Sequence, residues 1–443
     1  MKHTALTTLS LGSLLTMLLT GCGGDATNPY NDGTSGGITP AVTCASEGLP
    51  VLTGVQTGDV NIASNAVYGI DGEVTFPAGT TLTIGSGAKI VGCTGQSYIA
   101  IDQGAQIEAI GTSVDPIVMT SIQDHAGLNN GTEQGEWGGL AIFGYAEGNK
   151  GLETYEAGDH LFSCDLGGVF PASQGGTVLC NDADNSGTLK YVIIKHSGFE
   201  VETDKELNGL SLGGIGSGTT IDNVAVIGSL DDGIEVWGGK VNMTNLYIFN
   251  NADDSLDWDH GWTGSATNVY VEQRNVDGTG SRGFETDNNG GSTTKELTQP
   301  ISNPAIDKFT IITADAGGQG IVHREGTAGQ LSNGIIITNN AGKGNIEVRS
   351  ATTVTNGLAY SGAMVLSHAA SIHYKGSLEN LNDSIFGDVT DEEVEDIVSD
   401  ADAVGAHVGA TVTLDSSGTD LATLQAATPT AGNQADFSWV WAP

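Results

Sequence analysis

The amino-acid sequence predicts an all-β protein whose body is a right-handed parallel β-helix with a short C-terminal capping helix. Two observations lead to this fold class. The composition is rich in glycine, with 66 Gly in 443 residues, and only 15% of residues are charged, which indicates many tight turns rather than a disordered acidic chain. Short strand-like segments also recur at an interval of about 22 residues, which suits one coil of a β-helix.

The repeat is clearest in the middle of the chain. Segment 227–239 aligns without a gap with segment 249–261, and shorter copies of the same strand follow at 283–287, 320–324 and 345–349. One short strand cannot bury a face alone, but a stack of such strands encloses a continuous interior. We therefore expect the β-helix to occupy residues 46–375.

A second strand starts with asparagine in most coils. The equivalent positions are Asn223, Asn245, Asn268, Asn333 and Asn356, and Lys308 takes the position once. Asparagines in successive coils can form a ladder of side-chain amides, and Asn tolerates the left-handed backbone that a sharp bend needs. The pattern predicts that these residues share one bend of the solenoid.

The N-terminus has the pattern of a secretion signal. Residues 1–21 begin with Lys2 and His3 and continue with an apolar stretch that is too short to span a membrane. The sequence Leu19-Thr-Gly-Cys22 resembles the lipobox of bacterial lipoproteins, which implies cleavage before Cys22 and lipidation of that residue. Gly23 is not the Asp that often retains lipoproteins at the inner membrane, so we expect an outer-membrane anchor, facing the periplasm or the cell surface.

Several segments fall outside the regular coils. Residues 22–45 are expected to be a flexible tether, and residues 376–443 a C-terminal cap. Within the cap, Thr390 to Val398 has the pattern of an amphipathic helix, and 437–441 alternates like a strand that packs against the wall. Insertions are expected near 124–136, 149–177 and 275–300.

Four cysteines remain after Cys22. An even number in an exported protein suggests disulfides, and the spacing favours Cys44–Cys93 and Cys164–Cys180.

The charge limits the possible partners. The chain has 15 Lys+Arg against 53 Asp+Glu, a formal charge of -38. Such a field repels nucleic acid, which we do not expect as a partner, and it favours Ca²⁺ or a cationic partner.

The repeats, together with Gly135-Glu-Trp-Gly-Gly139 and Asp184-Asn-Ser-Gly-Thr-Leu189, resemble bacterial surface lipoproteins of the pectate-lyase-like parallel β-helix superfamily. The resemblance covers roughly residues 60–375. It implies the fold more strongly than an activity, because this fold carries lyases, hydrolases and adhesins.

Strand alternation predicts which side chains face outward. Side chains switch faces at every residue, and equivalent positions in stacked coils lie about 4.8 Å apart. The outer face then carries a ladder of Glu235, Asp257 and Glu285. Asp259 and Asp287 lie beside this ladder, which ends in Arg324 and Arg349. By the same alternation His323 faces inward, as a hydrogen-bonded core histidine.

Three functional hypotheses follow from the ladder, because close carboxylates repel unless a proton, a cation or an arginine neutralises them. In the first, the ladder binds Ca²⁺ and with its help an extracellular ligand, most plausibly a glycan. The cation ligands would be Glu235, Asp257, Asp259, Glu285 and Asp287, and the ligand-binding residues Trp237 and Arg349.

In the second hypothesis the same face belongs to a polysaccharide lyase or glycoside hydrolase. Its catalytic residues would be Asp257, Asp259, Glu285 and Arg324. In the third, the acidic face is solvated and the chain is an adhesive or structural spacer. The paired aspartates at 231–232 and 253–254 are expected to end turns rather than to bind cations.

Overall fold

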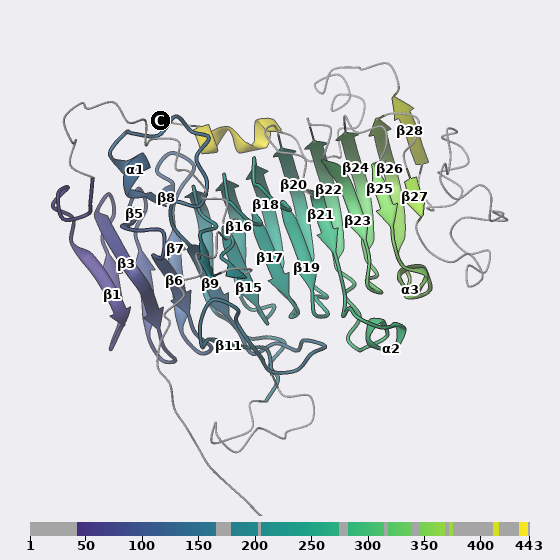
Figure 1. Cartoon of the computed structure of the whole chain (residues 1–443), viewed down its shortest axis with the longest axis horizontal. Helices are drawn as coiled ribbons and strands as arrows, with labels where there is room; N and C mark the ends of the chain where they lie inside the picture. The colour runs from purple at the N-terminus through teal and green to yellow at the C-terminus, as the bar shows by residue number, and fades with distance from the viewer. Residues whose placement is uncertain are drawn as a thin grey trace, which may run out of the picture. The chain divides into compact units, whose positions relative to one another are not determined.

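The structure, a computed structural model, describes residues 42–164, 179–202, 205–273, 282–313, 318–338, 345–367, 372–374, 411–415 and 434–441. Its strands stack in chain order into one 24-stranded sheet that winds around a common interior (Figure 1). Within the described residues, strands of successive coils pair in parallel, from the first coil to the last. The predicted right-handed parallel β-helix is confirmed.

The early coils use three separate strands per turn, except at the start, where one long strand spans two of the faces. Three stacks run side by side: β2–β4–β7, β3–β5–β8 and β3–β6–β9. Their strands are β1 (Val51–Val55), β2 (Val60–Ile62), β3 (Val67–Phe76), β4 (Thr81–Ile84), β5 (Lys89–Gly92), β6 (Tyr98–Ile101), β7 (Gln106–Ile110), β8 (Ile117–Ser121) and β9 (Gly139–Phe143).

From β12 (Gly187–Lys195) onward, the first two faces join in one bent strand per coil, because β12 pairs with both β7 and β8. The later bent strands are β16 (Thr220–Ile227), β18 (Asn242–Phe249), β20 (Ser265–Gln273), β22 (Ala305–Thr313), β24 (Gln330–Thr338) and β26 (Ala359–Ser367), and β28 (Thr411–Asp415) pairs with the last of them.

The third face continues as a stack of short strands, which we call the ladder sheet. After β6 and β9 it contains β15 (Leu210–Gly213), β17 (Ile234–Trp237), β19 (Leu256–Asp259), β21 (Arg282–Thr286), β23 (Gln319–His323), β25 (Ile346–Val348) and β27 (Ile372–Tyr374). The described connections and C-terminal segment also carry short hairpins and helices. They are β10 (Glu153–Thr154) with β11 (Leu161–Phe162), β13 (Glu200–Glu202) with β14 (Lys205–Glu206), α1 (Ile122–His125), α2 (Thr293–Glu296), α3 (Ala351–Thr355) and the 3₁₀ helix η2 (Gln434–Trp441).

The asparagines lie at the bend of the long strands, as predicted. Asn223, Asn245, Asn268 and Asn333 have positive φ, between 54° and 60°, and Lys308 has φ 59°. Asn268 Nδ2 donates to Asn245 Oδ1 at 2.7 Å. The expectation for Asn356 is wrong: it precedes β26 in the turn after α3, and its amide donates to the carbonyl of Gly326.

The interior of the solenoid is apolar and includes large aromatic side chains. Strand alternation places the residues next to the outward ladder inside, and those on β17, β19 and β21 are fully buried: Ile234, Val236, Leu256, Trp258 and Phe284.

His323 also lies inside the solenoid, where its Nδ1 is 2.7 Å from Thr286 Oγ1 and its Nε2 2.6 Å from the Tyr360 hydroxyl. The expected hydrogen-bonded core histidine is therefore confirmed.

The C-terminal segment packs against the wall but is not a strand. Residues 434–441 form the 3₁₀ helix η2 (the yellow coil in Figure 1). Phe437 has non-helical backbone angles and marks a kink in this segment, and Phe437, Trp439 and Val440 are buried. The Phe437 ring lies 5.6 Å from that of Tyr247 on the outer face of β18. The expected helix at 390–398 lies outside the described residues.

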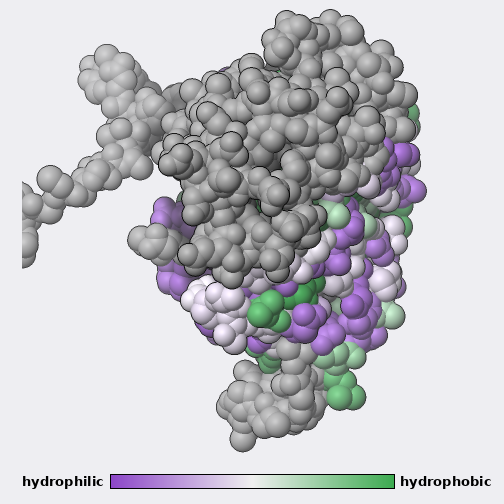
Figure 2. All heavy atoms as spheres, turned by 90° about the vertical axis from the view of Figure 1, so that its right-hand side faces the viewer, coloured by the Kyte–Doolittle hydropathy of each residue, from purple (hydrophilic) through white to green (hydrophobic). Residues whose placement is uncertain are grey.

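Both expected disulfides, Cys44–Cys93 and Cys164–Cys180, are present. In the part of the chain that the structure describes, no helix combines the length and the apolar character needed to cross a bilayer. The surface near β27 and β28 is largely hydrophilic where it is described, with small hydrophobic patches (Figure 2).

Candidate metal centre

The register of the ladder sheet brings three carboxylates into one outward column. Glu235 of β17 pairs with Asp257 of β19, which pairs with Glu285 of β21. Because paired residues in a parallel sheet point to the same face, these side chains stack as predicted.

The bends before β17 and β19 add four more carboxylates to this column. Three overlapping groups have one carboxylate oxygen from each member within 4.8 Å of the others. The groups are Asp231, Asp232 and Asp253; Asp232, Glu235 and Asp257; and Asp254, Asp257 and Glu285. The sequence interpretation assigned the paired aspartates to turns, although they repeat at the same 22-residue interval as the ladder.

Close contacts between neighbouring coils hold the bends in place. The backbone N–H of Asp254 donates to Asp232 Oδ1 at 2.8 Å, and Asn208 Nδ2 donates to Glu235 Oε2 at 2.7 Å. A Cβ at Gly233 would lie 2.5 Å from the Asn251 amide nitrogen and 2.6 Å from the Ser255 carbonyl oxygen. Only glycine therefore lets consecutive bends approach closely enough to bring their carboxylates together.

The carboxylates of the column are costly to ionise. Burial raises the pKa of Asp232, Glu235 and Asp257, and the charges of neighbouring carboxylates raise it further. Asp257 Oδ1 is buried and has no hydrogen-bond partner among the described residues. An orphaned oxygen inside a set of carboxylates fits a hard cation such as Ca²⁺, whose oxygen ligands lie about 2.3–2.6 Å from the ion.

Two arginines neutralise one end of the column. Arg282 pairs with Asp254 at 3.0 Å and with Glu285, and Arg324 pairs with Glu285 and with Asp287 at 2.7 Å. Arg324 is thus held by two carboxylates instead of being free as a catalytic base. Asp287, expected as a cation ligand, is paired with Arg324, and its role toward a cation stays a prediction.

Asp259, also expected as a cation ligand, lies outside the three carboxylate groups, and that role stays a prediction. It pairs with Lys150 at 3.3 Å and with His260 at 3.0 Å. Burial alone would raise its pKa, but the hydrogen bonds from His260 and the charges of His260 and Lys150 lower it. Of the four residues expected to be catalytic, Asp259, Glu285 and Arg324 are therefore held in ion pairs, whereas Asp257 makes none among the described residues.

Comparison of the sequence with known protein families identifies the family of this chain. A family model described as a pectate-lyase-like β-helix domain matches residues 54–422. The chain belongs to this family. No curated protein and no solved structure matched the chain. Membership of the pectate-lyase-like family is compatible with a carbohydrate-related function and does not by itself assign a ligand.

In this pectate-lyase-like chain the β10–β11 hairpin covers Trp237, which was expected to bind a glycan. Trp237 faces outward beside Asp259 but is only 8% exposed. Tyr155 and Phe162 lie on it, with ring centroids 5.6 Å and 5.9 Å away. With the hairpin in this position Trp237 offers little surface to a glycan, and its expected ligand-binding role stays a prediction. Arg349, the other expected ligand-binding residue, pairs with Glu347 at 3.0 Å.

The cover, residues 151–164 with β10 and β11, is anchored at several points. His160 Nδ1 lies 2.6 Å from Asp102 Oδ1, and its Nε2 lies 3.2 Å from the Tyr98 hydroxyl. The Tyr155 hydroxyl lies 3.0 Å from Ser211 Oγ on the ladder sheet. Asp253 is exposed and Asp231 half-buried, so the carboxylate column reaches solvent along the bends rather than over Trp237.

Proposed function

We propose that this protein is an exported, outer-membrane lipoprotein that binds Ca²⁺ on the ladder sheet and, through the bound ion, an extracellular anionic glycan. The observation that carries the proposal is the position of Asp257. Its carboxylate belongs to two of the three groups, and its buried Oδ1 has no hydrogen-bond partner among the described residues.

Charge and geometry favour Ca²⁺ over protonation as the resting state outside the cell. Oxygens that share one Ca²⁺ at about 2.4 Å lie no more than about 4.8 Å apart, and the oxygens of each group satisfy that limit. The other means of neutralisation, the arginines, are concentrated at the Glu285 end. Asp231, Asp232 and Glu235 therefore remain available for a cation.

A glycan fits this site only with the help of the ion. A chain of formal charge -38 repels uronates and sulfates. Bound Ca²⁺ would neutralise the column and offer its open coordination positions to the carboxylate or hydroxyl oxygens of a glycan. Exposed Asp253 and half-buried Asp231 mark where such a ligand would approach.

A lyase or hydrolase activity at the same face is the second candidate, and family membership is the observation that favours it. The pairing of Arg324 with Glu285 and Asp287 weighs against it, because a lyase base must be free to accept a proton. A spacer without a ligand would need neither the orphaned oxygen nor the close bends.

Titration calorimetry on chelator-treated protein tests the cation step. We expect Ca²⁺ to bind the wild type and to bind Asp257→Asn at least tenfold more weakly. Asp71→Asn, at an exposed position of β3, is the matched control and should bind like the wild type. Equal Ca²⁺ binding by wild type and Asp257→Asn, or none by the wild type, would refute the site.

The glycan step is tested separately on a glycan array, with Ca²⁺ and with EDTA. Retention of uronate-containing glycans only with Ca²⁺ would support the proposal, and new absorbance at 235 nm on these polymers would identify a lyase instead. Silence in both assays would leave a Ca²⁺-stabilised spacer. Replacement of Cys22 by Ser should release the protein from the membrane fraction if the lipid anchor is real.

A further inference from the structure

A cavity of about 490 Å³ lies on another face of the solenoid, independent of the acidic column. Its floor is apolar and consists of Val118, Ile193, Ile227 and Val440. The first three are outward residues of β8, β12 and β16, and the fourth belongs to η2. The volume is in the range of about 300–1,000 Å³ typical of small-molecule sites.

The outward apolar residues of β8, β12, β16, β18 and β20 form a stripe that η2 partly covers. The cavity begins where this cover ends. Farther along the solenoid, Phe437 of η2 packs on Tyr247 and Tyr270, which continue the outward column of Ile193. The cavity is therefore the part of this stripe, toward Val118, that η2 leaves open.

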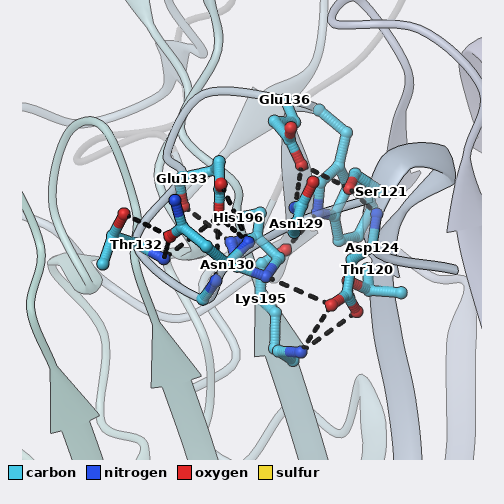
Figure 3. A network of polar contacts seen from close by, with 12 residues as sticks. Thr120, Ser121, Asp124, Asn129, Asn130, Thr132, Glu133, Glu136, Lys195 and His196 are labelled. Atoms are coloured by element: carbon cyan, nitrogen blue, oxygen red, sulfur yellow. Dashed lines mark hydrogen bonds and ion pairs between the residues drawn. The ribbon is translucent and has the colours of Figure 1, made fainter. Parts of the chain in front are cut away.

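One wall of the cavity carries an ion pair that is already satisfied. Lys195 Nζ lies 2.9 Å from Asp124 Oδ1, and Thr120 Oγ1 donates to Asp124 Oδ2 at 2.7 Å (Figure 3). Burial alone would raise the pKa of Asp124, but hydrogen bonds from His196, Thr120 and Lys195 hold it well below the ordinary value. This pair stays ionised and neutral as a unit, so it has little charge to offer a ligand.

Half-buried Lys89 and exposed Asp115 also line the cavity, and neither is held in such a pair. Within the described residues, neither side chain makes a hydrogen bond or an ion pair, and the two do not pair with each other. A free ammonium and a free carboxylate at one apolar-floored cavity match a ligand that carries both opposite charges and an apolar group.

We propose that this cavity binds a zwitterionic α-amino acid with an apolar side chain. The ligand's carboxylate would pair with Lys89, its ammonium with Asp115, and its side chain would lie on Val118, Ile193 and Ile227. The opposite charges make the site selective for the whole zwitterion, because a ligand that lacks one charge leaves its protein partner unpaired.

Calorimetry of the full chain with L-leucine tests the proposal, with N-acetyl-L-leucine and L-leucinamide as probes that each lack one charge. We expect leucine to bind and both derivatives to bind at least tenfold more weakly. Lys89→Gln should weaken leucine binding, and so should Asp115→Asn. Lys190→Gln removes a lysine of the Lys190–Asp222 pair outside the cavity and should have no effect.

Two outcomes would overturn the zwitterion site. One is the absence of leucine binding at millimolar concentration. The other is equal binding of leucine and its N-acetyl derivative, since the ammonium would then have no partner. Val118→Phe, which fills the floor without touching either charge, should abolish binding, and circular dichroism checks that each variant folds.

Discussion

At the scale of single residues, the chemistry of the site is concentrated in Asp257. Each of its neighbours in the column has a partner that lowers the free-energy cost of burying its charge. Glu285 pairs with Arg282 and Arg324, and Glu235 accepts a hydrogen bond from Asn208. Asp257 lies between them, its pKa raised by burial and by Asp254 and Asp259, with one oxygen unsatisfied. A carboxylate in this position destabilises the folded protein without a cation and stabilises it when a cation is bound.

Replacing Asp257 by Asn should therefore separate stability from binding. Without Ca²⁺ the variant is expected to be more stable than the wild type, by about 1 kcal/mol, because the amide removes a buried repulsive charge. With saturating Ca²⁺ the order should reverse. Urea denaturation with Ca²⁺ or with EDTA measures both, and a variant less stable than wild type in EDTA would contradict the assigned repulsion.

Asn245 is the second residue whose role can be isolated. Its backbone is left-handed, with φ 57°. Its side-chain Nδ2 donates a hydrogen bond to Asp222 Oδ1, and its Oδ1 accepts one from Asn268 Nδ2. We expect Asn245→Ala to lower the free energy of unfolding by about 2–3 kcal/mol, from backbone strain and lost hydrogen bonds. Asn245→Gly loses only the hydrogen bonds and should cost less in the same urea denaturation; equal costs would show that the backbone angle is unimportant.

At the scale of elements, the β10–β11 hairpin decides which part of the ladder sheet meets solvent. Tyr155 and Phe162 bury Trp237, and His160 fixes the hairpin to Asp102 and Tyr98 at the start of the solenoid. The hairpin is held mainly by these side-chain contacts, because β10 and β11 have only two residues each.

His160→Ala is expected to loosen this hairpin without unfolding the solenoid. The change removes the polar contacts with Asp102, Tyr98 and Glu73 and the ring that stacks on Phe143 at 5.3 Å. Hydrogen exchange should accelerate in residues 151–162 and stay unchanged in β17 and β19. Tyr155→Phe, which loses only the contact with Ser211, is the milder control. Unchanged protection in the hairpin would show that the contacts of His160 are not needed to hold it.

At the scale of the whole molecule, periodic features were predictable from the sequence and non-periodic ones were not. The 22-residue repeat predicted the coil, its bend at Asn245 and the column of Glu235, Asp257 and Glu285. The partners of these residues come from irregular connections, such as Lys150 beside Asp259. A repeat carries no information about where such connections fold. The 3₁₀ conformation of η2 was missed because Phe437, Trp439 and Trp441 also alternate like a strand.

The column also links the stability of the whole molecule to pH and Ca²⁺. Burial and the charge of Asp253 raise the pKa of Asp231 to about 8, and the pKa values of Asp232, Glu235 and Asp257 are raised as well. In the unfolded chain these groups titrate near pH 4. Between these limits the Ca²⁺-free folded state binds more protons than the unfolded state, so the free energy of unfolding falls as pH rises.

Thermal denaturation from pH 7 to 8.5 should therefore show a falling midpoint in EDTA and a stabilisation by Ca²⁺ that grows with pH, since protons and the cation compete for the same oxygens. The slope is about 1.4 kcal/mol per pH unit for each proton difference. Lower pH is unsuitable, because burial lowers the pKa of His323 to about 3, and this histidine makes stability rise with pH until about 6.5. Asp257→Asn lacks one of the titrating carboxylates, so its midpoint in EDTA should change less with pH than that of the wild type. A wild-type midpoint in EDTA that rises between pH 7 and 8.5 would mean that the column is not the dominant titrating element. The variant would then not show the flatter profile.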